Sequence, residues 1–394
     1  MLNKTQYTEQ FGLKDRAILV PGPGQKAPWR IPAGGHVPTE WRIRLEDCRE
    51  EQRKLWDEVL HQPETKRIQR VFARDLECPQ KVWHLDCRAD SEAEDGLLPV
   101  LLPRTEKGKS MAFHIKLPAG KKARLIFMER AGGKRPEAAE LPEEQAMQHE
   151  GLPNVTIRAE LGPYAELEII YVHPLYGEED GDAYLRPGQK KHCLYLAEAA
   201  EGASYKWTSV NFGDSLIERG AVHLNGEGAS ADVGGAAYIQ SESEQLYQSH
   251  IHCHKPHEIC RVHNHGVVEN HGKGTFISVS NIDKGAHGTA AREDNRFMTL
   301  GKEAKAYADP TLLIDEYDVK ASHAATVGQV DEEALFYLKS RGLNDSQAAR
   351  LMTAGFLTPL FDRISIPALK ERLLQQFYEK LQMDEIIGKA EDHV

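Results

Sequence analysis

The chain has few cysteines, and none of them forms a C-x-x-C pair. The 394 residues contain six, at scattered positions: Cys48, Cys78, Cys87, Cys193, Cys253 and Cys260. Zinc fingers and ferredoxin-type sites use closely spaced cysteines, so the sequence excludes a local cysteine cage. Six scattered thiols in a long chain also argue against a disulfide framework, and we expect them to be reduced.

The sequence also lacks long apolar runs and an excess of positive charge. No run of about 18 apolar residues is present, which excludes a membrane-spanning helix. The net charge of -11, without any Lys/Arg-rich run, argues against nucleic acid as a partner. The first residues, starting at Met1, have no apolar core of the kind found in signal peptides. We therefore expect a cytoplasmic protein that contacts neither membrane nor nucleic acid.

Catalytic signatures are missing as well. There is no G-x-S-x-G motif, and no cysteine lies in a known nucleophile motif. The glycine-rich run Pro21–Gly24 lacks the Gly-Lys-Ser/Thr ending of a phosphate-binding loop, and its prolines remove amide donors that such a loop needs. These absences favour a protein that is not an enzyme.

What the sequence does contain, over residues 95–328, is a series of short β-type segments. They are four to eight residues long, rich in Val, Ile, Tyr and Phe, and often begin after a glycine-containing turn: Lys122–Met128, Val155–Ala159, Leu167–Val172, Tyr205–Phe212, Ala236–Ile239 and Thr275–Val279. No helical pattern separates them, which argues against a doubly wound α/β sheet. A β-sandwich and a coil of stacked strands both remain, and the small residues at the turns favour the coil.

The first 94 residues differ from this pattern and are expected to form an α/β region. Apolar residues at helical spacing predict a helix over Leu45–His61, with Trp56 in the core. A second departure is the acidic, proline-containing segment 131–150. Its polarity predicts an exposed excursion from the β core.

Residues 329–394 predict a C-terminal domain of three helices. The first begins at the cap Asp331 and stops at Gly342. The second begins at Asn344, with Gln347 completing a capping pair, and should bury one stripe: Ala348, Leu351, Met352, Gly355, Phe356 and Leu360. The third follows Ser365, has Pro367 in its first turn, and carries Leu369, Leu373, Leu374, Phe377 and Leu381.

The densest group of metal-binding residue types is the histidine-rich stretch 250–265. His252 and His254 alternate on a predicted strand, and Glu258 follows four residues later. This spacing resembles the first half of the cupin motif H-x-H-x(3,4)-E, which holds a metal inside a β-barrel. The leading glycine of that motif is missing, because Leu246 takes its place, and the second half has no counterpart. An alternative hypothesis is therefore a cupin-like metalloenzyme; the imidazoles could equally line the polar face of a strand.

The segment Asp318–Gly328 marks the change from β-type to helical sequence. At its centre lies His323, between the small residues Ser322 and Ala324. Small neighbours leave an imidazole accessible to a partner surface. Two roles are open for His323: a polar residue at a strand end or a functional group.

This segment and the helices after it resemble the carboxy-terminal signature of the SufB/SufD family of iron–sulfur cluster assembly proteins. The residues that carry the resemblance are Asp318–Gly328, Asp331–Leu343, Ala348, Leu351, Gly355 and Phe356, with thinner support from Arg292–Arg296, Leu300, Gly301, Pro310 and Leu312. The first 100 residues contribute little. The histidine-rich stretch 250–265 is denser than the resemblance leads us to expect, which leaves an accessory metal site at His252, His254 and Glu258 open.

The resemblance implies a right-handed parallel β-helix with a helical end domain. It implies a SufB-like partner, a SufC-like ABC ATPase docked on the helical domain, and a transient iron–sulfur cluster at the subunit interface, with His323 as the ligand from this chain; a homodimer is the other arrangement. We expect the ATPase at the first helix, through Phe336, Tyr337, Arg341 and Gly342. No cysteine follows Cys260, so the chain resembles SufD and not SufB, which carries its cluster cysteine near this segment. Ala321 and Ala324 replace the Cys and Gly of many relatives, which removes a thiol role there.

Overall fold

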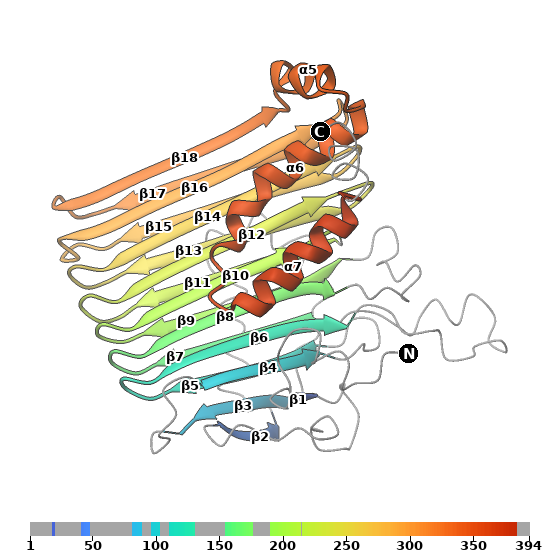
Figure 1. The fold of residues 1–394 in the computed structure, drawn as a ribbon. Coiled ribbons are helices and arrows are strands. Elements are labelled where there is room, and N and C mark those ends of the chain that lie inside the picture. The colour runs from blue at the N-terminus through green and yellow to red at the C-terminus, as the bar shows by residue number, and fades with distance from the viewer. Residues whose placement is uncertain are drawn as a thin grey trace.

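Two nine-stranded sheets form the body of the protein, and successive strands alternate between them. The computed structural model describes residues 18–19, 41–47, 81–88, 96–102, 110–130, 154–175, 190–213 and 215–383. Figure 1 shows the strands stacked one above another into an elongated body, along which both sheets run. Among the described strands every pair is parallel except β2 with β3, which is antiparallel. This arrangement confirms the predicted parallel β-helix core and excludes the β-sandwich.

The first sheet contains β1 and the even-numbered strands from β4 onward. Their bounds are β1 Ile18–Leu19, β4 Gly96–Leu102, β6 Lys122–Arg130, β8 Glu166–Leu175, β10 Ser204–Asn211, β12 Ser230–Ile239, β14 Ile259–Glu269, β16 Thr289–Leu300 and β18 Val319–Gln329. The second sheet contains β2 and the odd-numbered strands: β2 Trp41–Asp47, β3 Lys81–Cys87, β5 Ser110–Leu117, β7 Asn154–Leu161, β9 Lys191–Ala199, β11 Leu216–Leu224, β13 Glu244–Cys253, β15 Lys273–Ile282 and β17 Lys305–Ile314. The most C-terminal coil, formed by β17 and β18, is therefore the last layer of the stack.

Both sheets extend into the first 94 residues, because β3 pairs with β5 and β1 pairs with β4. Leu45, where a helix was expected to begin, lies in β2, so the start of that helix was wrong. Trp41 is buried and Ile43 half-buried, whereas Arg42 and Arg44 are exposed, as expected for a strand with one buried face. The remainder of the predicted helix, Trp56 and the excursion 131–150 lie outside the described residues.

One corner of the coil repeats the same tight turn in each layer. Its central residues have φ of 58° to 71°: Gly120, Tyr164, Gly202, Gly228, His257 and Gly288. Each donates its backbone N–H to a carbonyl in the next turn over 2.6–3.0 Å, forming a ladder along the corner. Positive φ favours glycine, so the glycine-containing turns of the sequence are explained. Tyr164 and His257 are the members that sequence reasoning could not assign.

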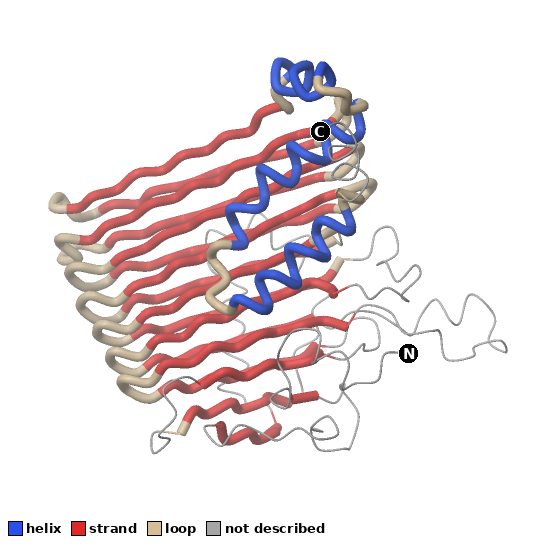
Figure 2. Tube along the Cα trace, in the orientation of Figure 1, coloured by secondary structure: helices blue, strands red, loops and turns tan. Residues whose placement is uncertain are grey.

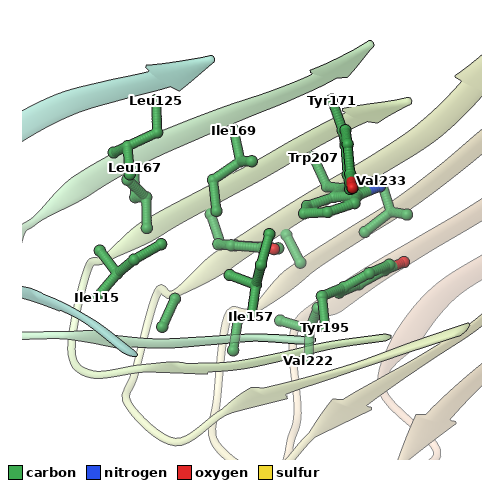
Figure 3. Packing of buried hydrophobic residues seen from close by; sticks show 14 of the residues in the cluster. Ile115, Leu125, Ile157, Leu167, Ile169, Tyr171, Tyr195, Trp207, Val222 and Val233 are labelled. Atoms are coloured by element: carbon green, nitrogen blue, oxygen red, sulfur yellow. The ribbon is translucent and has the colours of Figure 1, made fainter. Parts of the chain in front are cut away.

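The interior of the stack is apolar over most of its length. Rows of alternate residues from both sheets meet there, among them Leu125, Ile157 and Ile169 (Figure 3). Tyr195 and Trp207 stack with ring centroids 4.3 Å apart. Such interdigitation at near-crystalline density holds the two sheets together.

The C-terminal helices are α5 (Glu332–Ser340), α6 (Asp345–Phe361) and α7 (Pro367–Lys380). Figures 1 and 2 show α6 and α7 lying across the strands of the first sheet, whereas α5 follows β18 at the end of the stack. α6 and α7 share one apolar cluster with the outer face of that sheet; Phe377 stacks on Phe212 with centroids 5.0 Å apart. The three helices are confirmed, and two of them are packed on the β core.

The caps agree with expectation, and the buried stripe of α6 differs from it. Asp331 caps α5, and Asn344 and Gln347 form the full capping box of α6. The α6 stripe is rotated from the predicted one: Thr353 and Leu357 are buried, whereas Gly355 is exposed. The buried stripe is the side of α6 that packs on the outer face of the first sheet. Periodicity in the helix sequence does not show which side that is. The third helix begins one residue later than expected, with Ile366 in place of Ser365 as its cap.

Removing the α6 cap is expected to lower stability modestly. Asn344 accepts a hydrogen bond from the Gln347 backbone over 2.9 Å. Asn344→Ala should cost about 1 kcal/mol, the usual contribution of an N-cap. The midpoint of thermal unfolding measures this loss, and Asn344→Ser, which keeps a capping oxygen, serves as the control. Equal midpoints for Ala and Ser would show that the cap contributes nothing.

Candidate functional site

The segment Asp318–Gly328 forms most of the last strand, β18. β18 pairs with β16 on one side, and among the described residues no strand pairs with its other side. Val319 and Ala321 pack partly against the core. Because side chains alternate along a strand, His323 lies on the same inward-facing row. It is nevertheless exposed, since no further coil covers this end of the stack.

Directly beneath His323, the register places Glu293 of β16. Glu293 is buried and accepts hydrogen bonds from Ser278 at 2.8 Å and Ser280 at 2.6 Å. Burial raises the pKa of this carboxyl, and the two serines and the nearby His323 imidazole oppose that rise. An exposed imidazole thus lies over a buried carboxyl group at the open end of the coil.

A line of buried amides continues from this carboxyl into the stack. Asn295 donates to Ser278 over 2.8 Å, and Asn264 donates to Asn295 over 2.9 Å. Buried polar groups are normally hydrogen-bonded, and here the side chains bond to one another. Glu293 is therefore held in place by a fixed network, which makes the floor of the His323 site rigid.

A second polar cluster lies deeper, inside the coil. Lys191 and Glu129 form a buried ion pair, and Lys191 also contacts Tyr171 and His173 at 2.9 Å each. His173 meets Ser209 at 3.1 Å. Charges in this environment are tolerated only when they are paired and hydrogen-bonded. The cluster is a structural feature that the sequence pattern did not reveal.

The histidine-rich stretch contributes to a group on the outer face of the second sheet. His223 of β11 pairs in register with His252 of β13, and their rings stack 4.6 Å apart. His254 follows β13 and reaches both His223, at 3.2 Å, and Asp283, at 2.6 Å. Burial, together with the neighbouring histidines, lowers the pKa of His223 and of His252 to about 4. These rings are neutral near pH 7.

Glu258 has a different environment. It is buried at the turn after β13, and neither of its carboxylate oxygens has a hydrogen-bond partner among the described residues. Burial raises its pKa to about 8. Nearby, the thiol of Cys253 is hydrogen-bonded to Cys260. The parallel coil is also not the barrel that the cupin hypothesis required.

No three His, Cys, Asp or Glu side chains of the described residues are already arranged to hold a metal ion. The predicted triad of His252, His254 and Glu258 is included in that statement. A metal role for these residues therefore stays a prediction that would require side chains to move.

The residues predicted to bind the ATPase lie in α5 and directly after its C-terminal end. Phe336 and Tyr337 are 74% and 56% exposed, and no residue of α5 is buried. The Arg341 guanidinium lies 5.1 Å from the Tyr337 ring centroid, and Gly342 ends the helix with φ 95°. Large exposed aromatic side chains on a short, well-capped helix form a surface suited to a protein partner.

Several residues of these sites escaped sequence reasoning. Glu293 lies in the Arg292–Arg296 segment, but only the strand register brings it under His323. His223 and Asp283 are single polar residues in separate strands and turns, and pairing of β11, β13 and β15 brings them to His254. Stretches that are far apart in sequence give no local signal of such contacts.

Comparison with known proteins identifies the family. The SufBD core domain of the SUF system for FeS cluster assembly matches residues 139–356, more than half of the chain. The iron–sulfur cluster assembly protein SufD of Bacillus subtilis is 33% identical over 174 residues, covering 44% of this chain and 39% of that protein. SufD of Escherichia coli is 28% identical over 188 residues, covering 48% and 44%.

A SufBD family protein of Synechocystis is 28% identical over 229 residues, covering 56% of this chain and 50% of its own length. The matches thus span half or less of each of these relatives. Separately, none of the helices among the described residues is long and apolar enough to cross a membrane. The β-helix, the terminal strand with His323 and these matches together show that the chain belongs to the SufB/SufD family of iron–sulfur cluster assembly proteins, as a SufD-like member.

Proposed function

We propose that this chain is the SufD-like subunit of a Suf assembly scaffold, in which a nascent iron–sulfur cluster forms against its terminal strand. The observation that carries this proposal is the position of His323, exposed on the inward-facing row of β18 over the buried Glu293. In this proposal the cluster is cargo shared with a SufB-like partner. The chain itself has no catalytic step and works in the cytoplasm.

The same end of the stack is suited to pairing with a second subunit. β17 and β18 are the end strands of their sheets, and unpaired edges are templates for another strand. Large apolar side chains are exposed on this end: Tyr307, Leu313, Ile314, Tyr317 and Val327. A partner that covers them would also enclose His323 and exclude water from the site. We define Leu313 and Val327 as the terminal-edge pair.

Imidazole is a suitable ligand for a cluster that must later be released. Neutral histidine binds iron as a borderline donor, and it leaves more readily than thiolate. No cysteine of the sequence follows Cys260, and the buried Cys253 and Cys260 lie at an earlier turn of the coil. Thiolate ligands for the cluster would therefore come from the SufB-like partner.

The exposed helix α5 is the proposed dock for a SufC-like ABC ATPase. It follows β18 at the end of the stack (Figure 1). Its Phe336 and Tyr337 side chains are exposed. Because α6 and α7 share an apolar cluster with the first sheet, deleting the C-terminal helices would expose the apolar outer face of that sheet to water. Substitutions on α5 test docking without that damage.

Co-expression of the tagged chain with its SufB-like and SufC-like partners tests both contacts at once. Leu313→Asp/Val327→Asp should lose the SufB-like subunit and keep the ATPase, because charge is placed on the terminal edge. Phe336→Ala/Tyr337→Ala should lose the ATPase and keep the SufB-like subunit. Each double variant is the matched control for the other, and Tyr164→Ala removes an exposed aromatic residue elsewhere.

Amounts of each subunit captured on the tag are the readout. We expect at least a tenfold loss of one partner in each double variant. Capture of both partners at wild-type levels by both variants would contradict the assigned surfaces. If an untagged copy of the chain is co-expressed as well, capture of that copy without the SufB-like subunit would favour the homodimer.

A further inference from the structure

The outer face of the second sheet carries three histidines whose contacts the proposed function does not use. His223 and His252 are cross-strand neighbours, and their rings are nearly parallel, at 8°. The His254 ring is parallel to His223 within 2°, with centroids 5.5 Å apart. All three are half-buried. They lie on β11, on β13 and directly after β13, and β15 separates these strands from the terminal strand β17 of the same sheet.

Hydrogen bonds determine which nitrogen of the His254 ring carries the proton. His254 donates from Nδ1 to Asp283 over 2.6 Å, and Asp283 also accepts from Asn281 over 2.9 Å. With its proton on Nδ1, His254 presents the lone pair of Nε2. A histidine held by a carboxylate in this way is the usual outer arrangement around a bound metal ion.

The lone pair of His254 Nε2 points at His223 Nδ1, and the two nitrogens are 3.2 Å apart. Two imidazole nitrogens bound to one tetrahedral ion at about 2.0–2.1 Å would lie about 3.3–3.4 Å apart. The separation of the two nitrogens therefore already suits one shared ion. To bind it, both rings would turn until their lone pairs converge, and His223 would move its proton from Nδ1 to Nε2.

His252 supplies an independent observation. Its Nε2 is buried and has no hydrogen-bond partner. Buried polar atoms are seldom left without one, so an unpaired imidazole nitrogen beside a prearranged pair indicates a missing ligand. The three nitrogens do not yet converge on one point, and His252 would have to rotate to complete the site. Affinity should therefore be moderate.

We propose that His223, His254 and His252 bind a divalent transition-metal ion of the zinc and iron(II) class, with Asp283 as the residue that orients His254. Such ions accept neutral imidazole, whereas calcium and magnesium prefer oxygen ligands. The site replaces Glu258 of the predicted triad with His223. It goes beyond the proposed function, because it lies away from His323 and needs no partner subunit.

Titration of the metal-free full-length chain with Zn²⁺, followed by calorimetry, tests the proposal. We expect one site per chain, and at least a tenfold loss of affinity in His223→Ala and in His254→Ala. Asp283→Asn should weaken binding 10- to 100-fold, the usual effect of losing an orienting partner. His271→Ala, at an exposed histidine on another turn, is the matched control and should bind like wild type.

Zinc K-edge absorption gives a second readout, which does not depend on affinity. Scattering from two or three imidazoles is expected in wild type, and fewer in His252→Ala. Thermal melts of the metal-free variants check folding. Retention of wild-type affinity in both His223→Ala and His254→Ala would overturn the proposal, as would equal loss in His271→Ala, which would mean adventitious binding to surface histidines. Unchanged affinity and scattering in His252→Ala would remove that ring from the site.

Discussion

His323→Ala is expected to reduce cluster formation on the assembled complex at least tenfold while leaving the subunits associated. The imidazole is exposed at the end of the coil, so its removal creates no cavity. Alanine suits β18, which already has alanines at Ala324 and Ala325. What alanine cannot supply is a nitrogen lone pair for iron. Reconstitution with iron and sulfide, followed by visible absorbance, measures the loss.

His323→Cys distinguishes a ligand from a shape effect. Thiolate also ligates iron, so this variant should recover part of the absorbance that alanine loses. Thermal melts and subunit capture are the controls for both variants. Normal cluster yield in His323→Ala would contradict the ligand role. A collapsed melt would instead make His323 a structural residue of the terminal strand.

Lys191→Met is expected to have the largest effect on stability. Lys191 and its partner Glu129 are both buried inside the coil. Removing the ammonium group leaves the carboxylate in the interior with the Tyr171 hydroxyl as its hydrogen-bond partner and the His173 imidazole 3.5 Å away. Breaking a buried pair in this way costs about 3–5 kcal/mol. The midpoint of thermal unfolding should fall by several degrees.

Removing both charges should restore much of that loss. In Lys191→Met/Glu129→Gln the remaining amide is neutral, and it can still bond to Tyr171. The double variant should therefore be more stable than Lys191→Met alone, which is the signature of coupled charges. If the two substitutions add without coupling, the ion pair does not stabilise the interior in the way described here.

Local sequence pattern was enough to predict the type of most elements. The β-type segments between residues 95 and 328 coincide with strands, because each buries a row of apolar side chains. The caps Asp331 and Asn344 were also predicted, since a cap depends only on residues within one turn. The glycine-containing turns were predicted for the same reason, and several of them lie at the corner of the coil.

Features that depend on register could not be predicted. The stripe of α6 is set by the sheet face that it covers, and Glu293 becomes part of the His323 site only through the pairing of β16 with β18. Likewise, His223 contacts His254, which lies 31 residues further along the sequence, only because β11 pairs with β13. The histidine-rich stretch was noticed, but its candidate partner Glu258 was chosen from spacing along the chain, which does not report that His223 and Asp283 lie next to His254.

The most direct test of the account is whether a histidine nitrogen of this chain is bound to the cluster. The chain would be labelled with ¹⁵N-histidine, assembled with unlabelled partners, reconstituted and reduced to a paramagnetic cluster. Pulsed electron paramagnetic resonance should then show coupling to ¹⁵N in wild type and none in His323→Ala. An absence of ¹⁵N coupling in wild type, or its persistence in His323→Ala, would contradict the assignment of His323 as the ligand.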